Sequence, residues 1–571
     1  MARQEAIKQM QKLQRAHAFF EQGNTARAGN LVDEVLASNP EDVTALKLSA
    51  VIARAEGKLD KALDRFVAAA RQDPSDAQTM DAVTAIALAL DRMAIATEAL
   101  ELAVIADPTD GARHRRLAEA YLEWGEFEEA LGHARLATTL APGDATAWAV
   151  TGAILLMLER YEPAYAACQR SLTLQPDVPQ PLLNAALALD ALGRVDEATQ
   201  LREQAGQIAP DDPTVAFHTK DIERFEAHDP RLSELERHVT DAQRPVNDRV
   251  LAGLALAKAY DDLGQYRLAA QHLVLANERW AALLERRKQA YDPERESRLL
   301  DVLERRLSDL DLQPVTSPDE GPIPIVMLGL PRSGKTLLEA RLAASSDVLG
   351  LGERPLLQPL IRALADGCGV RFPDGLDRLD EPCLRRAQGQ LRSVLLPEAS
   401  PPSTRALAVT SPGDLEAAPL LALCDARTLF VHVDRDPRDL LLANYLQFFP
   451  VGQQHACTVP GLVHRYQLLE GYAALVAQRF GPARIVRVSY EELVTDPAAV
   501  LGTVRAAAGL PVRTDVPTPA MSGVTEVAAS PSGRPDPAAP LHAAHVGFWR
   551  RWEAALPELF AAIDEAGLLR G

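Results

Sequence analysis

The sequence predicts a multidomain protein in which an all-α superhelix of repeats is followed by an α/β domain with a central parallel sheet. The chain has 571 residues, which is too many for a single hydrophobic core. Its first half carries small residues and prolines at a fixed period, as helical repeat arrays do. From residue 323 onward, short apolar runs alternate with helical segments, which is typical of an α/β domain.

The composition excludes several classes of protein. A formal net charge of −19 argues against a general nucleic-acid binder, because phosphate contacts need a basic face. The first 20 residues are charged throughout and do not resemble a signal peptide. No uninterrupted apolar run is long enough to predict a membrane span. The five cysteines show neither metal-ligand spacing nor a compact disulfide framework, so we expect reduced thiols and a cytoplasmic protein.

The repeats are identified by three residue types that keep one period of 34 residues. Proline recurs at Pro40, Pro74, Pro108, Pro142, Pro176 and Pro210. Alanine keeps the same step at Ala28, Ala62, Ala96, Ala130, Ala164 and Ala198. Glycine occupies a third register at Gly23, Gly57, Gly125 and Gly193, with Asp91 and Glu159 in the two remaining places. Three residue types locked to one period over six units predict a repeated structural element.

Each unit is predicted to be a pair of antiparallel helices. Glycine allows the tight turn between the two helices, alanine lets them approach closely, and proline ends the second helix. This pattern resembles the tetratricopeptide repeat (TPR) family. The expected domains are a TPR domain over 1–285, regular over about 9–212 and irregular over 213–285, a helical linker over 286–320 and the α/β domain over 321–571. Gly264 and Ala269 suggest a seventh, less regular unit.

The α/β domain begins with a phosphate-loop pattern. A buried strand is predicted over 323–328, and it runs into Gly329-Leu-Pro-Arg-Ser-Gly-Lys-Thr336 and then an amphipathic helix. This is GxxxxGK[ST] in a strand–loop–helix context, in which backbone N–H groups and the helix N-terminus bind a phosphate. Lys335, which supplies a positive charge, is the only lysine after Lys288. We therefore expect phosphate binding at this loop.

The segment 331–357 resembles the 5′-phosphosulfate loop of the sulfotransferase family. Beyond the loop, the matching positions are Glu339, Asp347, Val348, Gly350, Gly352 and Glu353. The family has threonine where this chain has Lys335.

Three later segments resemble further parts of the same family. Residues 434–450 resemble its 3′-phosphate segment, with Arg435 at the arginine position but Ala443 where the family has serine. Asn444 or Arg438 is expected to compensate, or else the site has decayed. Residues 485–497 contain Tyr490 at the family's tyrosine, and residues 545–553 resemble its C-terminal motif. In the Pro-rich stretch between them, Ser530 and Arg534 are the nearest equivalents of further nucleotide ligands.

The domain order is similar to that of bacterial TPR–sulfotransferases with a tyrosylprotein-sulfotransferase-like C-terminal domain. The resemblance implies transfer of a sulfuryl group from PAPS (3′-phosphoadenosine 5′-phosphosulfate) to a hydroxyl, with no metal required. It implies catalytic roles for Arg332, Lys335 and Glu353, with Glu353 as the base. The implied PAPS-binding residues are Arg332, Ser333, Gly334, Lys335, Thr336, Arg435, Tyr490, Ser530 and Arg534. His432 is expected to be a packed core residue.

Acceptor and partner follow less directly. Protein tyrosine, polysaccharide hydroxyl and small alcohol are all compatible, and the array favours a protein or peptide docked on its concave face. The array could instead serve only as a homodimerisation arm or spacer. Two other functions remain open: a non-catalytic TPR adaptor with a degenerate sulfotransferase domain, and an ATP-dependent kinase or NTPase in which Asp434 binds Mg²⁺.

Overall fold

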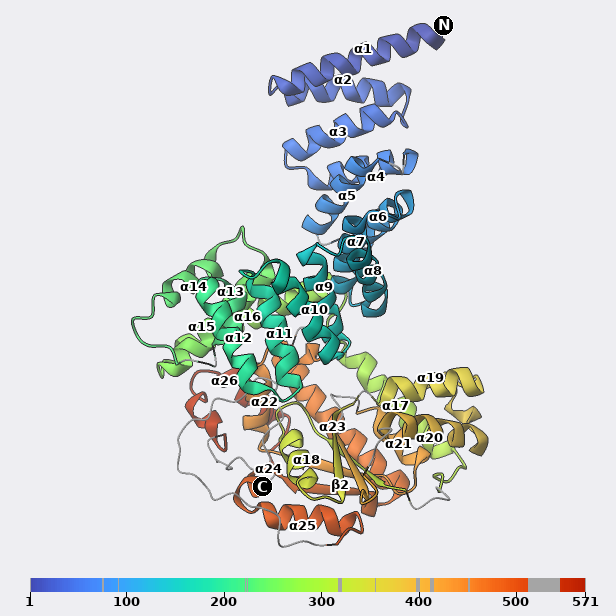
Figure 1. Ribbon diagram of the computed structural model, residues 1–571, viewed down its shortest axis with the longest axis vertical. Helices are drawn as coiled ribbons and strands as arrows, with labels where there is room; N and C mark the ends of the chain where they lie inside the picture. The colour runs from blue at the N-terminus through green and yellow to red at the C-terminus, as the bar shows by residue number, and fades with distance from the viewer. Residues whose placement is uncertain are drawn as a thin grey trace. The chain divides into compact units, whose positions relative to one another are not determined.

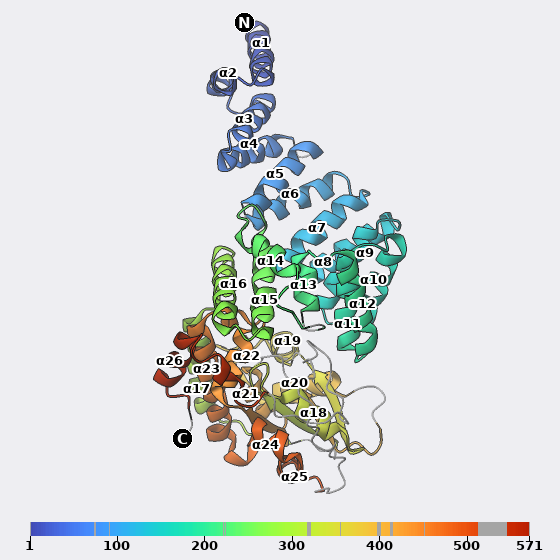
Figure 2. The ribbon, with the colours of Figure 1, turned by 90° about the vertical axis from the view of Figure 1, so that its left-hand side faces the viewer.

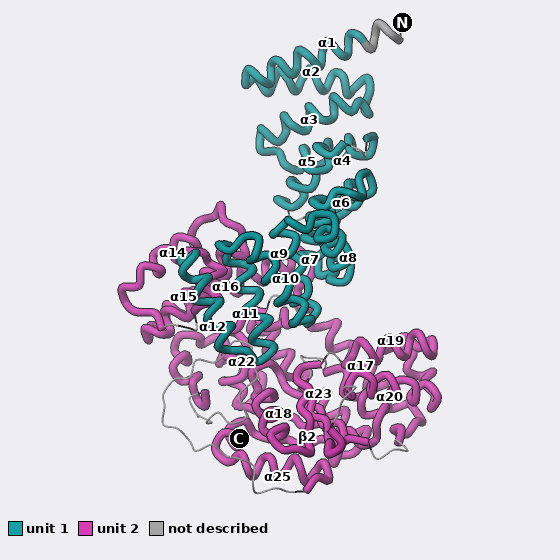
Figure 3. Tube along the Cα trace, in the orientation of Figure 1, with its two compact units in different colours: residues 1–210 teal, residues 211–571 magenta. Residues whose placement is uncertain are grey.

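The computed structural model describes residues 2–73, 76–90, 92–220, 222, 224–316, 321–354, 356–396, 401–410, 415–449, 452–511 and 545–569. Its internal contacts divide the chain into two compact units, Met1–Pro210 and Asp211–Gly571, coloured separately in Figure 3. The expected boundary between residues 285 and 286 therefore falls inside the second unit. Among the described residues, no helix is both long enough and apolar enough to cross a membrane.

The first unit is a stack of six helix pairs (Figure 1). They are α1 Ala2–Glu21 with α2 Thr25–Ser38, α3 Val43–Ala55 with α4 Leu59–Gln72, α5 Ala77–Ala89 with α6 Met93–Ala106, α7 Gly111–Trp124 with α8 Phe127–Leu140, α9 Ala145–Met157 with α10 Tyr161–Leu174, and α11 Pro179–Ala191 with α12 Val195–Ile208. This confirms the predicted pair of helices in each 34-residue unit.

The periodic alanines and glycines have the predicted roles. All six periodic alanines are fully buried, as expected where paired helices approach closely. The periodic glycines have positive φ, and Glu159, which takes a glycine place, has φ 57° as well. The turn therefore has the left-handed conformation at all five of the periodic positions that lie among the described residues. Aspartate keeps the same period in a fourth register: Asp42, Asp76, Asp110 and Asp144 each accept a hydrogen bond from the first turn of the next helix.

The second unit begins with helices that keep no 34-residue period. They are α13 Pro213–Thr219, α14 Arg231–Thr240, α15 Val246–Asp262, α16 Tyr266–Arg286 and α17 Pro293–Asp309. The helices are not a separate body, because Trp280 of α16 and Leu303 of α17 belong to the same buried cluster as Phe430 of the sheet.

The second unit contains a five-stranded, all-parallel sheet (Figure 2). Its strands are β1 Ile323–Leu328, β2 Val348–Glu353, β3 Ala406–Thr410, β4 Leu429–Asp434 and β5 Ile485–Ser489, in the spatial order β2-β3-β1-β4-β5. The three inner strands, β3, β1 and β4, are almost continuously buried, as expected for a parallel sheet covered on both faces, whereas the edge strands β2 and β5 are only partly buried.

Helices cover both faces of the sheet. The helices that follow β1 are α18 Lys335–Ala343, α19 Leu357–Cys368, α20 Glu381–Leu395, α21 Ala417–Cys424, α22 Pro437–Tyr445, α23 Val459–Phe480, α24 Tyr490–Thr495, α25 Pro497–Ala507 and α26 Pro557–Glu565. One core joins α18, α24 and α25 to the face that carries Met327 and Val431. The other joins α20, α21 and α23 to the face that carries Leu328 and Phe430.

The strand order reverses its direction at β1. From β1 the chain runs to β2 and β3 on one side, and it then crosses to β4 and β5 on the other side. In open α/β sheets, ligands bind beyond the carboxyl ends of strands at such a reversal. Here that place lies between the loop after β1 and the loop after β4.

Candidate functional site

The loop after β1 has the geometry of a phosphate cradle. Gly329 and Gly334 have φ values of 153° and 103°, and Arg332 has φ 68°. The chain then enters α18 at Lys335, so the N–H groups at the start of this helix are directed towards the loop. Ser333 is 1% exposed, and its Oγ has no hydrogen-bond partner in the part of the chain that the structure describes. A buried hydroxyl of this kind can donate a hydrogen bond to a bound anion.

Lys335 is buried at the base of this loop. It is 5% exposed, and its Nζ donates a hydrogen bond to the carbonyl oxygen of Gly329. Burial lowers the pKa of Lys335 to about 8, the carboxylate of Glu353 opposes that shift, and the positive charge of Arg465 adds to it. The ammonium is therefore still the major form at neutral pH, in a place where water hardly screens its charge.

Arg435, which follows β4, reaches the same loop. Its guanidinium donates hydrogen bonds to the carbonyl oxygens of Arg332 at 2.6 Å and His545 at 2.8 Å. It also lies over the ring of Tyr490, 4.6 Å from the centroid. Tyr490 in turn packs against Gly334, where a Cβ atom would lie 2.5 Å from Cδ2 of the ring. The residues predicted after β1, β4 and β5 are thus brought together at the reversal of the strand order.

The side chains near Ala443 are committed to structural contacts. Nδ2 of the fully buried Asn444 donates to the carbonyl oxygens of Pro331 and Leu440, both at 2.8 Å. Arg438 is paired with Asp436 at 2.7 Å. Both side chains are therefore engaged in contacts other than phosphate binding. The hydrogen bond from Asn444 to Pro331 supports the phosphate loop.

Glu353, the predicted base, ends β2 and is exposed. Its negative charge raises the pKa of Lys335, so the two groups are close enough to interact electrostatically. Arg332 is exposed and donates to Oε1 of Gln447 at 2.8 Å. The predicted ligands Ser530 and Arg534 lie outside the described residues.

Two features near this edge were not predicted from the sequence. The carboxylate of Asp439 on α22 accepts hydrogen bonds from the backbone N–H groups of Gly547 and Trp549, and thereby holds the C-terminal segment beside Arg435. In addition, the side chains of His432, Asp434 and Glu470 gather at the carboxyl end of β4. The two-residue spacing of His432 and Asp434 indicates from the sequence that both side chains lie on one face of the strand. Glu470 could not be added in this way, because its helix is far away in the sequence. His432 is 1% exposed, as expected.

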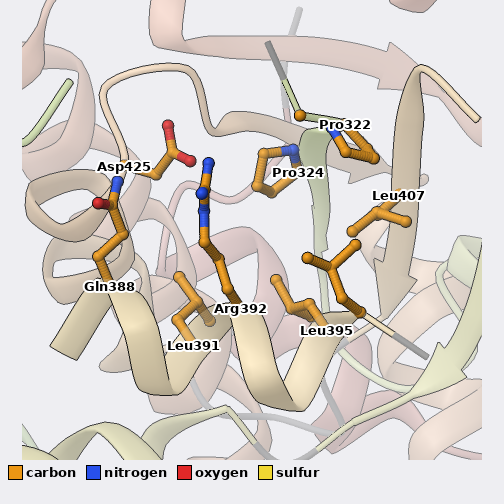
Figure 4. A pocket seen from close by; sticks show the side chains of 10 residues that line it. Pro322, Pro324, Gln388, Leu391, Arg392, Leu395, Leu407 and Asp425 are labelled. Carbon is orange, nitrogen blue, oxygen red and sulfur yellow. The ribbon is translucent and has the colours of Figure 1, made fainter. Parts of the chain in front are cut away.

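A separate pocket lies at the other end of the strands, where β1 begins (Figure 4). Pro322 and Pro324 form one wall, Leu391 of α20 forms another, and Gln388 and Asp425 supply polar groups. Because the amino ends of parallel strands lie away from the loops that follow them, this pocket contains none of the predicted site residues.

Comparisons with known proteins agree with this architecture. A sulfotransferase family model matches residues 324–515, and a tetratricopeptide repeat model matches residues 13–77 and 115–179. A relative, an uncharacterized protein of Aquifex aeolicus (strain VF5), is 23% identical over 333 residues. The match covers 55% of this chain and 41% of the relative, so the chain spans about two fifths of the length of that protein.

Several solved structures are similar to part of this chain, and two of the following three are described as TPR proteins. MamA from Desulfovibrio magneticus RS-1 is 17% identical, with a TM-score of 0.26, over 30% of this chain and 96% of the MamA chain. A TPR protein of Cytophaga hutchinsonii is 16% identical, with a TM-score of 0.31, over 46% of this chain and 99% of its own. YrrB, described as a TPR protein with an unusual peptide-binding site, is 20% identical, with a TM-score of 0.29, over 33% of this chain and 97% of its own.

Proposed function

We propose that this chain, which joins tetratricopeptide repeats to a domain of the sulfotransferase family, transfers a sulfuryl group from PAPS to a hydroxyl acceptor. The observation that carries the proposal is the meeting of Lys335 and Arg435 at the loop after β1. Cations from the ends of two neighbouring strands converge there, next to N–H groups at the start of a helix. Such a site suits a doubly anionic nucleotide.

The residues of the cradle fit the 5′ end of PAPS. Ser333 offers a buried hydroxyl, and Gly334 leaves the backbone open where a side chain would strike Tyr490. Lys335 and Thr336 begin the helix, and Arg332 lies on the exposed side of the loop. When bound, PAPS would supply the sulfuryl group, whose bond to the 5′-phosphate breaks as the bond to the acceptor oxygen forms.

Lys335 would stabilise the charge that grows on the leaving phosphate. Its ammonium is fixed by Gly329 and shielded from water, so its position does not have to change during the reaction. By analogy with single donors in other preorganised sites, its loss should cost about 2–4 kcal/mol of transition-state stabilisation. Sulfuryl transfer in this proposal requires no metal, because the protein supplies the positive charge.

Glu353 would take the proton of the acceptor hydroxyl as the new bond forms. Three observations support this role. Glu353 ends β2 at the same edge of the sheet as the phosphate loop, and its charge acts on Lys335. It is also exposed, as a base that meets an incoming acceptor must be.

The 3′-phosphate would be held mainly by Arg435, whose buried Nε has no hydrogen-bond partner among the described residues. Ala443 supplies no hydroxyl, while Asn444 and Arg438 are engaged elsewhere. The loss of one hydrogen bond to a charged acceptor corresponds to about 1.5–3 kcal/mol, or about 10–100-fold in affinity. Ser530 and Arg534 are proposed as further ligands. We therefore expect PAP, the desulfonated product, to bind less tightly than in a site with the serine.

The acceptor is proposed to be a protein or peptide, such as a tyrosine side chain presented by a segment docked on the concave face of the repeats. The repeat domain itself supports this proposal, because such arrays bind extended segments. A homodimer through the array is the alternative use of that surface. The five cysteines form no disulfide, which supports a cytoplasmic setting.

The first experiment measures ligand stabilisation. Thermal unfolding of the purified chain is followed with PAP, with Mg·ATP and with neither. A rise with PAP supports the proposal, and a rise with Mg·ATP alone supports a kinase or NTPase. If millimolar PAP does not raise the unfolding temperature, the result supports a non-catalytic adaptor. Ala443, which replaces the family's serine, is the reason to consider that alternative.

The second experiment measures transfer. The wild type, Lys335→Ala and Glu353→Ala are incubated with radiolabelled PAPS and host lysate. Loss of label transfer in both variants is expected, with PAP-induced stabilisation retained in Glu353→Ala because that residue is proposed to act on the acceptor. Equal labelling by all three proteins would contradict the assigned residues.

A further inference from the structure

We propose that His432, Asp434 and Glu470 form a binding site for a divalent metal ion of the class that accepts mixed imidazole and carboxylate ligands, such as Mn²⁺ or Zn²⁺. One ligand atom from each of the three residues lies within 4.8 Å of the other two. This site is not part of the proposed transfer reaction, in which Lys335, Arg332 and Arg435 supply the positive charge.

The fold brings the three residues together for simple reasons. His432 and Asp434 are two residues apart on β4, so their side chains leave the same face of the sheet. That face also carries Phe430, which belongs to the core shared with α23. Glu470 extends from α23 towards the end of β4, and its Oε1 lies 3.7 Å from Nε2 of His432.

The distances are close to those of a metal site. Two atoms bound to one ion at about 2.1 Å each can be at most about 4.2 Å apart. The His432–Glu470 pair already meets that limit, and a cluster spanning 4.8 Å needs only small side-chain rotations to close. A neutral imidazole nitrogen with two carboxylate oxygens is a donor set that suits Mn²⁺ and Zn²⁺.

The burial pattern also fits. His432 is 1% exposed and held by the strand, whereas Asp434 and Glu470 are half-buried and open a path to solvent. A rigid histidine with two adjustable carboxylates is an arrangement in which an ion can enter and the carboxylates can close on it.

Arg487 on β5 is the competitor for this site. Its guanidinium contacts both carboxylate oxygens of Glu470, at 2.8 Å and 3.3 Å, and its charge also interacts with Asp434. The Arg487 side chain is 42% exposed, so it can swing into solvent when an ion takes its place. The guanidinium thus provides positive charge to the same carboxylates that would bind the metal, and it should weaken metal binding without preventing it.

Because of this competition, two substitutions should change the metal affinity in opposite directions. The chelator-treated full-length protein is titrated with Mn²⁺, and free Mn²⁺ is followed by electron paramagnetic resonance. The wild type is expected to bind one ion per chain. Glu470→Gln removes a ligand and should weaken binding by about tenfold or more. Arg487→Gln removes the competitor and should tighten binding by about two- to fivefold.

A matched control separates this site from general attraction to an acidic protein. Glu492→Gln removes one exposed carboxylate on α24, outside the cluster, and should leave the Mn²⁺ affinity unchanged. Circular dichroism establishes that each variant is folded. The proposal is overturned if the wild type does not bind Mn²⁺ at millimolar concentration of the metal. It is also overturned if Glu470→Gln binds as tightly as the wild type, or if Arg487→Gln does not bind more tightly.

Discussion

The low pKa of Lys335 predicts that nucleotide affinity depends on pH in the alkaline range. The lysine is buried beside the carbonyl of Gly329, and burial is the main cause of its pKa of about 8. An anion in the phosphate loop interacts favourably only with the protonated amine. Binding of PAP must therefore be accompanied by proton uptake once the free amine begins to lose its proton.

The size of the effect follows from this pKa. Lys335 is about 90% protonated at pH 7 and about 9% protonated at pH 9. The affinity for PAP should fall about tenfold over this interval, or about 1.4 kcal/mol. The stability of the free protein should respond with the opposite sign. Because the unfolded lysine keeps its proton to higher pH than the folded one, this group makes the free protein more stable as the pH rises from about 8 to about 10.

The assay is calorimetric titration of PAP into the protein at pH 7, 8 and 9. The matched variants are Lys335→Arg, whose side chain stays charged throughout, and Lys335→Met, which is never charged. The arginine variant should bind with little pH dependence, and the methionine variant should bind weakly at every pH. A wild-type affinity that is constant between pH 7 and 9 would refute the reasoning, as would an arginine variant with the same slope.

Three further predictions concern the surroundings of the loop. Gly334→Ala combines a φ of 103° with a contact to Tyr490, so it should lower the free energy of unfolding by about 1–3 kcal/mol and abolish PAP-induced stabilisation, measured by thermal melting. Asp439→Ala leaves the N–H of Trp549 without its acceptor and should lower the free energy of unfolding by about 1.5–3 kcal/mol, measured in urea; an unchanged midpoint would contradict it. Arg435→Lys cannot reproduce the two-sided guanidinium contact, so PAP affinity measured by calorimetry should fall about tenfold or more, and an equal affinity would exclude Arg435 from the nucleotide site.

The repeat array could be predicted from sequence because its contacts are local. Each alanine that contacts the partner helix is separated from its glycine turn by five residues, so the same physical demand is repeated in the sequence. Glu159 is an example: it occupies a position that is glycine in other repeats, and it has the same positive φ, 57°. The 5′ loop was recognisable for the same reason, since the strand, turn and helix that form it are contiguous.

The long-range part of the site could not be obtained in this way. Whether Asn444 faced a nucleotide or the backbone of Pro331 depends on how α22 packs against the loop, which no local pattern encodes. The approach of Glu470 to His432 likewise depends on the path of α23 across the sheet. Ser530 lies outside the described residues and stays a prediction.

The position of β1 in the middle of the sheet affects the order in which the protein can assemble during synthesis. Its two neighbours, β3 and β4, leave the ribosome about 80 to 110 residues after it, so the central strand waits for both partners while the helical repeats can already fold through near-neighbour contacts. During that interval the exposed edges of β1 are open to association with other chains. A truncation that ends before β4 would carry the complete glycine loop yet lack one of the two strands that keep it in place.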